Sequence, residues 1–223
     1  MKTIAIVQAR LGSTRFPRKV LERIEGRPMI AHVVERVAAI GSDVHVIVAC
    51  PPDDRQAILA AVREAQCDQR HVYAPDVRAE DVLGRFAAVA KNYPADAYMR
   101  VTADCPLLAP DHAQAVLTLY RCQPKYVEVP APYYLDGFDV EVFSRELLER
   151  AEREATDPYD REHVAPWIQR ACGVYKEQFS PPCPRYKLSV DTQEDLDRVR
   201  RIMAKVKGLN FADTLAAAAE CGL

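Results

Sequence analysis

The sequence predicts an α/β fold of three layers, a mostly parallel sheet with helices on both faces. Short apolar runs recur along the first half of the chain and have the length of buried strands. Segments between them carry apolar residues at helical spacing, and this alternation is typical of βαβ units. With 223 residues, the chain fits a single domain spanning 1–223. The expected strands are 4–7, 44–49, 72–74 and 97–102, and the expected helices are 29–40, 55–65 and one within 76–93.

Composition narrows the class of protein. Hydrophobic residues make up 49% of the chain and charged residues 28%, as in ordinary globular proteins. A net charge of −2 argues against a nucleic-acid partner, which would need a basic face. No apolar run approaches the ~20 residues of a membrane span, and no signal peptide precedes the first strand, so we expect a cytoplasmic protein. The seven cysteines lack any C-x-x-C spacing and are expected to be reduced thiols.

A basic loop, residues 8–19, follows the first strand. It contains four cations beside a glycine and two hydroxyl residues, with no acidic residue to offset them. Such a loop could bind an anion, since backbone N–H groups and Arg or Lys side chains all donate to phosphate oxygens. It matches neither a Walker A loop nor a Rossmann fingerprint. A solvated loop is the alternative, but ligands bind where strands end in open α/β sheets. The residues concerned are Arg10, Gly12, Ser13, Thr14, Arg15, Arg18 and Lys19.

Two aspartates follow predicted strands elsewhere in the chain. Asp104 follows the strand 97–102, and Asp191 follows a short strand expected at 186–190. Asp104 could instead cap a helix, although Asp111 is the better cap candidate for the helix 113–122. Asp191 could likewise cap a final long helix, since acidic residues favour helix N-termini.

The segment 136–168 is expected to leave the sheet and to contact a substrate or a second subunit. Asp136-Gly137 is a turn signal, and alternation from Phe138 onward places Asp139 and Glu141 on one strand face. These acids could bind a ligand or could simply form a solvated face. His163 has a side chain suited to proton transfer near neutral pH, although a packing role is the simpler interpretation. Further elements are expected at 125–128 (strand), 144–155 (helix, capped by Ser144) and 212–220 (helix).

The basic loop and the two strand-end carboxylates together suit phosphoryl or nucleotidyl transfer. Mg²⁺ needs only one or two protein carboxylates when substrate phosphates complete its ligands. Asp104 and Asp191 would hold this metal, while Arg10, Arg15 and Lys19 would neutralise a triphosphate and the leaving pyrophosphate. The catalysis would rest on positioning and electrostatic stabilisation.

Several motifs in the same order resemble the sugar-activating cytidylyltransferases. QARLGSTRFPRKVL at 8–21, DCPL at 104–107, DGFDVE at 136–141 and VDTQEDL at 190–196 carry the resemblance. The chain is most similar to the spore-coat-polysaccharide branch, whose relatives include the CMP-Kdo and CMP-sialic acid synthetases. Two positions depart from the family pattern, because Arg18 and Ala103 stand where the family usually has Gly.

This resemblance implies a Rossmann-like nucleotide-diphospho-sugar transferase fold. It also implies an enzyme that transfers CMP from CTP to a sugar or sugar acid for surface polysaccharide synthesis, releases pyrophosphate and needs Mg²⁺. A homodimer is expected only from the segment 136–168, which could contact a second subunit. The implied catalytic residues are Arg15, Lys19 and Asp104, with Asp104 and Asp191 on the metal. Nucleotide contacts are implied for Gln8, Ala9, Arg10, Gly12, Ser13, Thr14 and Arg85, and acceptor contacts for Asp136, Asp139, Glu141 and His163.

Other functions remain open at this point. The same chemistry on a polyol phosphate or phosphonate would use the same residues. A nucleotide-sugar glycosyltransferase would be expected to show a D-x-D metal motif, but Asp104-Cys105-Pro106 lacks the second Asp. A catalytically silent binding protein would tolerate the loss of Lys19 or Asp104, and both are present.

Overall fold

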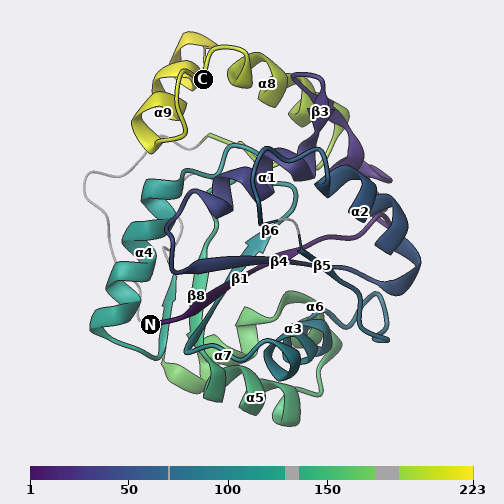
Figure 1. Ribbon diagram of the computed structural model, residues 1–223, viewed down its shortest axis with the longest axis vertical. Helices are drawn as coiled ribbons and strands as arrows, with labels where there is room; N and C mark the ends of the chain where they lie inside the picture. The colour runs from purple at the N-terminus through teal and green to yellow at the C-terminus, as the bar shows by residue number, and fades with distance from the viewer. Residues whose placement is uncertain (70, 129–135, 174–185, 223) are drawn as a thin grey trace.

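The computed structural model describes residues 1–69, 71–128, 136–173 and 186–222 (Figure 1). Its central sheet has the strand order β5-β4-β1-β6-β8-β7. The first four of these strands are parallel, whereas β8 runs antiparallel to both β6 and β7. The mostly parallel sheet is therefore confirmed. The strands are β1 (Thr3–Gln8), β4 (Val44–Ala49), β5 (His71–Tyr73), β6 (Ala97–Thr102), β7 (Tyr126–Glu128) and β8 (Glu141–Ser144).

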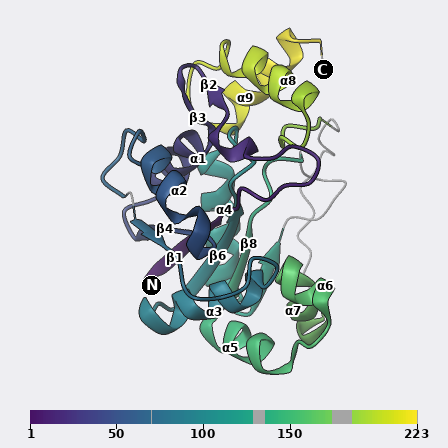
Figure 2. The ribbon, with the colours of Figure 1, turned by 90° about the vertical axis from the view of Figure 1, so that its right-hand side faces the viewer.

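Helices cover both faces of the sheet, as the two ribbon views show (Figures 1 and 2). On one face lie α1 (Met29–Ala38), α2 (Arg55–Val62) and α4 (Pro110–Cys122), with α8 (Gln193–Met203) and α9 (Phe211–Glu220) beyond them. On the other face lie α3 (Val82–Asn92), α5 (Arg145–Glu154), α6 (Pro158–His163) and α7 (Ala165–Cys172).

The alternation of side chains along β1 explains the two cores. Ala5 and Val7 point into the cluster that contains α1 and α4, while Ile4 and Ile6 point into the cluster that contains α3 and α5. All four side chains are buried. Apolar burial stabilises the folded chain by roughly 25 cal/mol per Å². Because β1 buries side chains on both of its faces, it is held from both sides. Its carboxyl end therefore places the basic loop at the middle of the sheet edge, between β4 and β6.

Smaller elements lie between β1 and α1. The loop ends in the 3₁₀ helix η1 (Lys19–Leu21), and a hairpin of β2 (Arg23–Ile24) and β3 (Arg27–Pro28) follows. A second 3₁₀ helix, η2 (Pro52–Asp54), precedes α2. The hairpin turn has positive φ at Glu25 and Gly26, as type I′ turns require.

Three local predictions need correction. The segment 186–190, expected as a strand, forms only one isolated β-bridge, which joins Lys187 to Asp136. The strand expected from Phe138 begins at Glu141. Asp111 does not cap α4, whose N-cap is Ala109; its carboxylate accepts from the backbone of Phe211 instead. The N-cap of α2 is Asp54, but its side chain does not cap the helix. The Ser144 cap of α5 is confirmed.

The segment 136–168 contributes β8 to the sheet and three helices to one face. Its expected contact with a substrate or a second subunit stays a prediction. Cys50, Cys105, Cys122, Cys172 and Cys221 are free thiols. Among the helices built from the described residues, none combines the length and apolar character needed to cross a bilayer.

Candidate active site

A cavity of about 490 Å³ opens at the carboxyl ends of β1 and β6. The basic loop forms one wall, α3 and α6 form another, and Asp191 closes the side near α8. The candidate residues for nucleotide, metal and catalysis all line it: Gln8, Ala9, Arg10, Gly12, Ser13, Thr14, Arg15, Lys19, Arg85, Asp104 and Asp191, together with His163.

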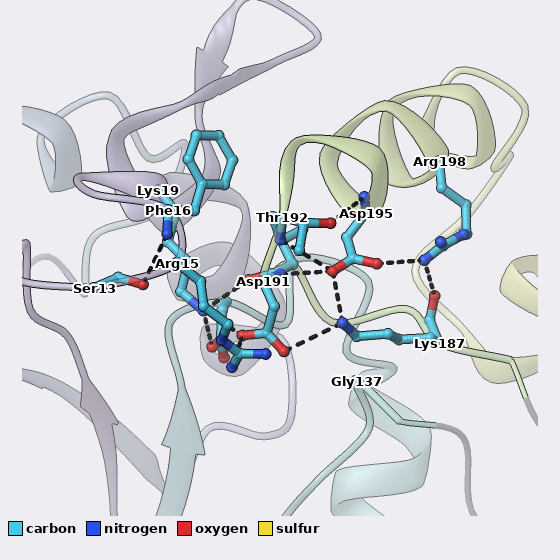
Figure 3. A network of polar contacts seen from close by, with 12 residues as sticks. Ser13, Arg15, Phe16, Lys19, Gly137, Lys187, Asp191, Thr192, Asp195 and Arg198 are labelled. Atoms are coloured by element: carbon cyan, nitrogen blue, oxygen red, sulfur yellow. Dashed lines mark hydrogen bonds and ion pairs between the residues drawn. The ribbon is translucent and has the colours of Figure 1, made fainter.

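Lys19 lies at the centre of the polar contacts in this cavity (Figure 3). Its Nζ donates to Asp104 Oδ2 at 2.7 Å, to Asp191 Oδ1 at 2.9 Å and to the backbone carbonyl of Val190 at 2.7 Å. An ammonium has three protons, so its donor capacity is fully used. Burial disfavours the charge, but the two carboxylates outweigh that effect and raise the pKa of Lys19. The ammonium thus holds together two carboxylates that are 87 residues apart in the sequence.

Asp191 is surrounded by cations. Arg15 contacts its Oδ1 at 2.9 Å, and Lys187 contacts its Oδ2 at 3.2 Å. Burial by itself would raise the pKa of Asp191, but Lys19 and Lys187 lower it overall. Thr192 follows as the N-cap of α8 and forms a capping box with Asp195.

Main-chain hydrogen bonds bring this aspartate to the sheet edge without a strand. The Val190 N–H donates to the carbonyl of Asp104 at 2.9 Å, and the Leu188 N–H donates to the carbonyl of Asp136 at 2.7 Å. The chain passes so close to Gly137 that a Cβ there would lie 2.7 Å from the backbone carbon of Leu188. The Asp136-Gly137 turn therefore supports the segment that ends in Asp191.

The path of the basic loop is set by contacts that the sequence does not reveal. Asp54 Oδ2 accepts the N–H of Leu11 at 2.8 Å, so this carboxylate fixes the loop rather than a helix. The carbonyl of Leu11 accepts the N–H of Arg18 at 2.9 Å, which closes the loop on itself. Arg18 has φ 61° and ψ 16°, a left-handed conformation that favours glycine. This backbone conformation gives a physical reason for the Gly that the resembled family usually has at this position.

The far wall of the cavity also carries charge. Arg10 pairs with Glu162 of α6 at 2.7 Å. Arg85 is buried and donates to the carbonyls of Arg78 and Ala79. Burial and, after it, the charge of Arg10 lower the pKa of Arg85. Among the described residues, its Nε has no hydrogen-bond partner, so one buried donor is left unsatisfied beside the cavity.

The residues expected to bind an acceptor fall into two groups. His163 lines the cavity at the end of α6. Asp136, Asp139 and Glu141 are not among the described residues that line it. Asp139 accepts the N–H of Gly137 at 3.1 Å, and Glu141 pairs with Arg100 at 2.8 Å. The nearby residues 129–135 lie outside those described, and the acceptor role of all four residues stays a prediction.

Glu141 reaches the cavity indirectly through Arg100. The Nε of Arg100 donates to Gln8 Oε1 at 2.9 Å while its Nη1 pairs with Glu141. Arginine has no acceptor, so this contact orients the Gln8 amide with its oxygen toward the Arg100 guanidinium. Sequence reasoning missed Arg100, Glu162, Asp54 and Lys187, because no motif or spacing connects them to the loop they contact.

The geometry fits a divalent metal bound together with phosphate. Asp104 and Asp191 present carboxylate oxygens to one ammonium, so a cation is already favoured at the point where they meet. Hard oxygen ligands of this kind suit Mg²⁺, which needs few protein ligands when phosphates and water supply the rest. In the described part of the chain, no group of three or more His, Cys, Asp or Glu side chains could hold a metal alone.

Comparisons with known proteins agree with this geometry. A family model described as Cytidylyltransferase matches residues 4–208. The spore coat polysaccharide biosynthesis protein SpsF of Bacillus subtilis is 29% identical over 213 residues, covering 90% of this chain and 85% of that protein.

Two solved structures share the fold. A cytidylyltransferase from Leptospira borgpetersenii has a TM-score of 0.84 at 23% identity, covering 99% of this chain and 94% of that one. A CMP:2-keto-3-deoxy-manno-octonic acid synthetase, solved in complex with CTP, has a TM-score of 0.70 at 22% identity, covering 92% and 99%. At these identities the structures establish the fold, and they confirm the Rossmann-like nucleotidyltransferase architecture expected from the sequence.

Proposed function

Because the chain belongs to the cytidylyltransferase family and is a nucleotidyltransferase that uses CTP, we propose that it transfers CMP to a sugar or sugar acid and releases pyrophosphate. Its product would be a CMP-activated sugar for surface polysaccharide synthesis. The similarity to SpsF supports that role. The single observation that carries the proposal is the contact of one ammonium, Lys19, with both Asp104 and Asp191.

The basic loop would bind the triphosphate. Gly12, Ser13 and Thr14 line the cavity together with the cationic residues Arg10, Arg15 and Lys19. Their positive charges would offset the negative charge that grows on the leaving pyrophosphate. Gln8, Ala9 and Arg85 would contact the nucleoside, and the unsatisfied Nε of Arg85 supports a polar contact there.

Asp104 and Asp191 would hold Mg²⁺. Bound there, the metal would supply Lewis-acid stabilisation of phosphoryl charge. The acceptor hydroxyl would attack the α-phosphorus of CTP, forming a new P–O bond while the bond to pyrophosphate breaks. Lys19 and Arg15 would keep the phosphates aligned for this displacement, because a small misplacement in such a reaction costs rate steeply.

The acceptor side rests on fewer contacts. His163 lines the cavity and could accept the proton of the attacking hydroxyl. Asp136, Asp139 and Glu141 would contact the sugar. We further propose a cytoplasmic enzyme and a homodimer that uses the segment 136–168.

Pyrophosphate release tests the proposal. Four nucleoside triphosphates would be compared with and without Mg²⁺, on a panel of sugars, sugar acids and polyol phosphates. We expect release from CTP only, with Mg²⁺, and only with a sugar or sugar acid. Release with a polyol phosphate instead of a sugar would show that the acceptor is a polyol phosphate. Turnover of a nucleoside diphosphate sugar would overturn the proposal in favour of a glycosyltransferase.

A further inference from the structure

A polar network lies behind Asp191, on the side away from the cavity (Figure 3). Its centre is Asp195, whose side chain is 5% exposed. The Oδ2 atom of Asp195 accepts from the Lys187 ammonium at 2.6 Å and from the N–H groups of Asp191 at 3.0 Å and Thr192 at 3.1 Å. Its Oδ1 atom accepts from Arg198 at 2.8 Å. Both carboxylate oxygens are thus engaged, and the network is satisfied.

Helix capping accounts for only part of this network. A capping box needs one contact from the side chain at the third helical position to the N–H of the cap residue, here from Asp195 to Thr192. The contacts to the Asp191 N–H and to Lys187 have no role in capping. Both act on Asp191, the first by fixing its backbone and the second by presenting Lys187 to its Oδ2 atom.

Lys187 itself is held at two points. Its ammonium is bound to Asp195, and its carbonyl accepts from Arg198 at 3.2 Å. With Lys187 on Oδ2, the Oδ1 atom of Asp191 is the one that meets Lys19 and Arg15 in the cavity. A carboxylate gripped in this way cannot rotate to exchange its oxygens without breaking the contact to Lys187.

From this geometry we infer that Lys187 and Asp195 are a positioning pair that fixes the Asp191 carboxylate for metal binding. This inference rests on the proposed role of Asp191 as a metal ligand. Residues that orient a metal ligand from behind typically change metal affinity 10–100-fold when they are altered. Neither side chain of the pair is among the described residues that line the cavity.

Two variants separate positioning from the other roles of the pair. Asp195→Glu keeps the charge and keeps a standard capping-box residue, but its longer side chain cannot keep the same contacts to Asp191 and Lys187. Lys187→Met removes a positive charge beside a metal ligand. Loss of that charge alone would tighten binding of a cation, whereas loss of orientation would weaken it.

The chain offers a matched control for each variant. Asp213 occupies the third position of α9, as Asp195 does in α8, and its carboxylate accepts from the side-chain amide of the cap residue Asn210, but it lies outside the cavity. Lys205 is a lysine at the surface that contacts the carbonyl of Glu220. Asp213→Glu and Lys205→Met therefore repeat the same chemical changes away from Asp191.

The experiment measures Mn²⁺ binding in the presence of CTP without acceptor, using the electron paramagnetic resonance signal of free Mn²⁺. We expect Asp195→Glu and Lys187→Met to weaken Mn²⁺ affinity about 10–100-fold, with both controls at the wild-type value. Thermal unfolding of every variant would be recorded to confirm folding. Wild-type affinity in Asp195→Glu, or unchanged or tighter binding in Lys187→Met, would overturn the inference.

A fifth variant, Asp191→Asn, keeps the two proposals distinguishable. If it binds Mn²⁺ with CTP as well as the wild type does, the proposed metal role of Asp191 is wrong and the inference falls with it. If it loses Mn²⁺ while the Lys187 and Asp195 variants keep it, only the positioning pair is refuted.

Discussion

The left-handed backbone at Arg18 leads to a prediction about stability. Arg18 has φ 61°, its side chain is exposed, and it forms no ion pair with the described residues. The hydrogen bond from the backbone N–H of residue 18 to the carbonyl of Leu11 would be kept in Arg18→Gly. The substitution therefore removes backbone strain without removing a packing contact.

The size of the effect follows from two opposing terms. A left-handed conformation costs an L-residue roughly 1–2 kcal/mol. Glycine loses more freedom on folding, which returns about 0.5–1 kcal/mol of that gain. The net increase in the free energy of unfolding is then about 0.5–1 kcal/mol, which corresponds to a rise in Tm of about 1–4 °C for a chain of this size.

Thermal and urea unfolding of wild type, Arg18→Gly and Arg18→Ala would measure this effect. Alanine removes the same charge as glycine but keeps the Cβ, so Arg18→Ala should stay within about 0.5 kcal/mol of wild type. The difference between the two variants isolates the backbone contribution. If Arg18→Gly is no more stable than Arg18→Ala, the strain argument is refuted.

The remaining predictions concern the site and its support. Lys19→Met and Asp104→Asn should each lower the rate of pyrophosphate release at least 100-fold while the chain still folds, and EDTA should abolish release until Mg²⁺ is restored; near-wild-type rates would contradict their roles. Gly137→Ala, at φ +107° and against the Leu188 backbone, should lower the free energy of unfolding by about 2 kcal/mol or more, and an unchanged urea midpoint would contradict that close approach. Burial alone would raise the pKa of Asp191 and Asp195, but neighbouring Lys and Arg side chains lower both. The two carboxylates therefore stabilise the folded chain above their unfolded pKa of about 4, and this stabilisation is lost as the pH falls through their lower pKa values in the folded chain. The Tm of Asp191→Asn, measured from pH 6 to pH 2, should therefore fall less steeply than that of the wild type. Parallel Tm curves for the two proteins would count against this account.

The sequence was sufficient to predict the sheet and its helices, because both leave periodic apolar patterns. The strand 97–102 and the Ser144 cap follow directly from such local signals. Asp191 reached its predicted place for a different reason than expected. The strand before it is absent, and a main-chain bond from Val190 to Asp104 holds the segment instead.

Contacts between distant loops account for what the sequence could not predict. Asp54 accepts a hydrogen bond from the N–H of Leu11, which is 43 residues away in the sequence, and Glu162 accepts one from Arg10, which is 152 residues away. Neither partner has a pattern that depends on the other, so only the folded chain brings them together. Asp54 is instructive, because an acid before a helix is normally interpreted as a cap, and here that side chain serves the loop.

The position of Lys19 explains how a site assembled from such distant segments is stable before any substrate binds. Two carboxylates brought together at the sheet edge repel each other, and partial burial strengthens that repulsion. Lys19 removes this penalty, since its ammonium contacts both Asp104 and Asp191 and also the carbonyl of Val190. The same side chain is thus a folding contact between the basic loop, β6 and the segment before α8. A triphosphate offers Lys19 other anionic partners, so the contact that organises the carboxylates is also one that a nucleotide can draw upon.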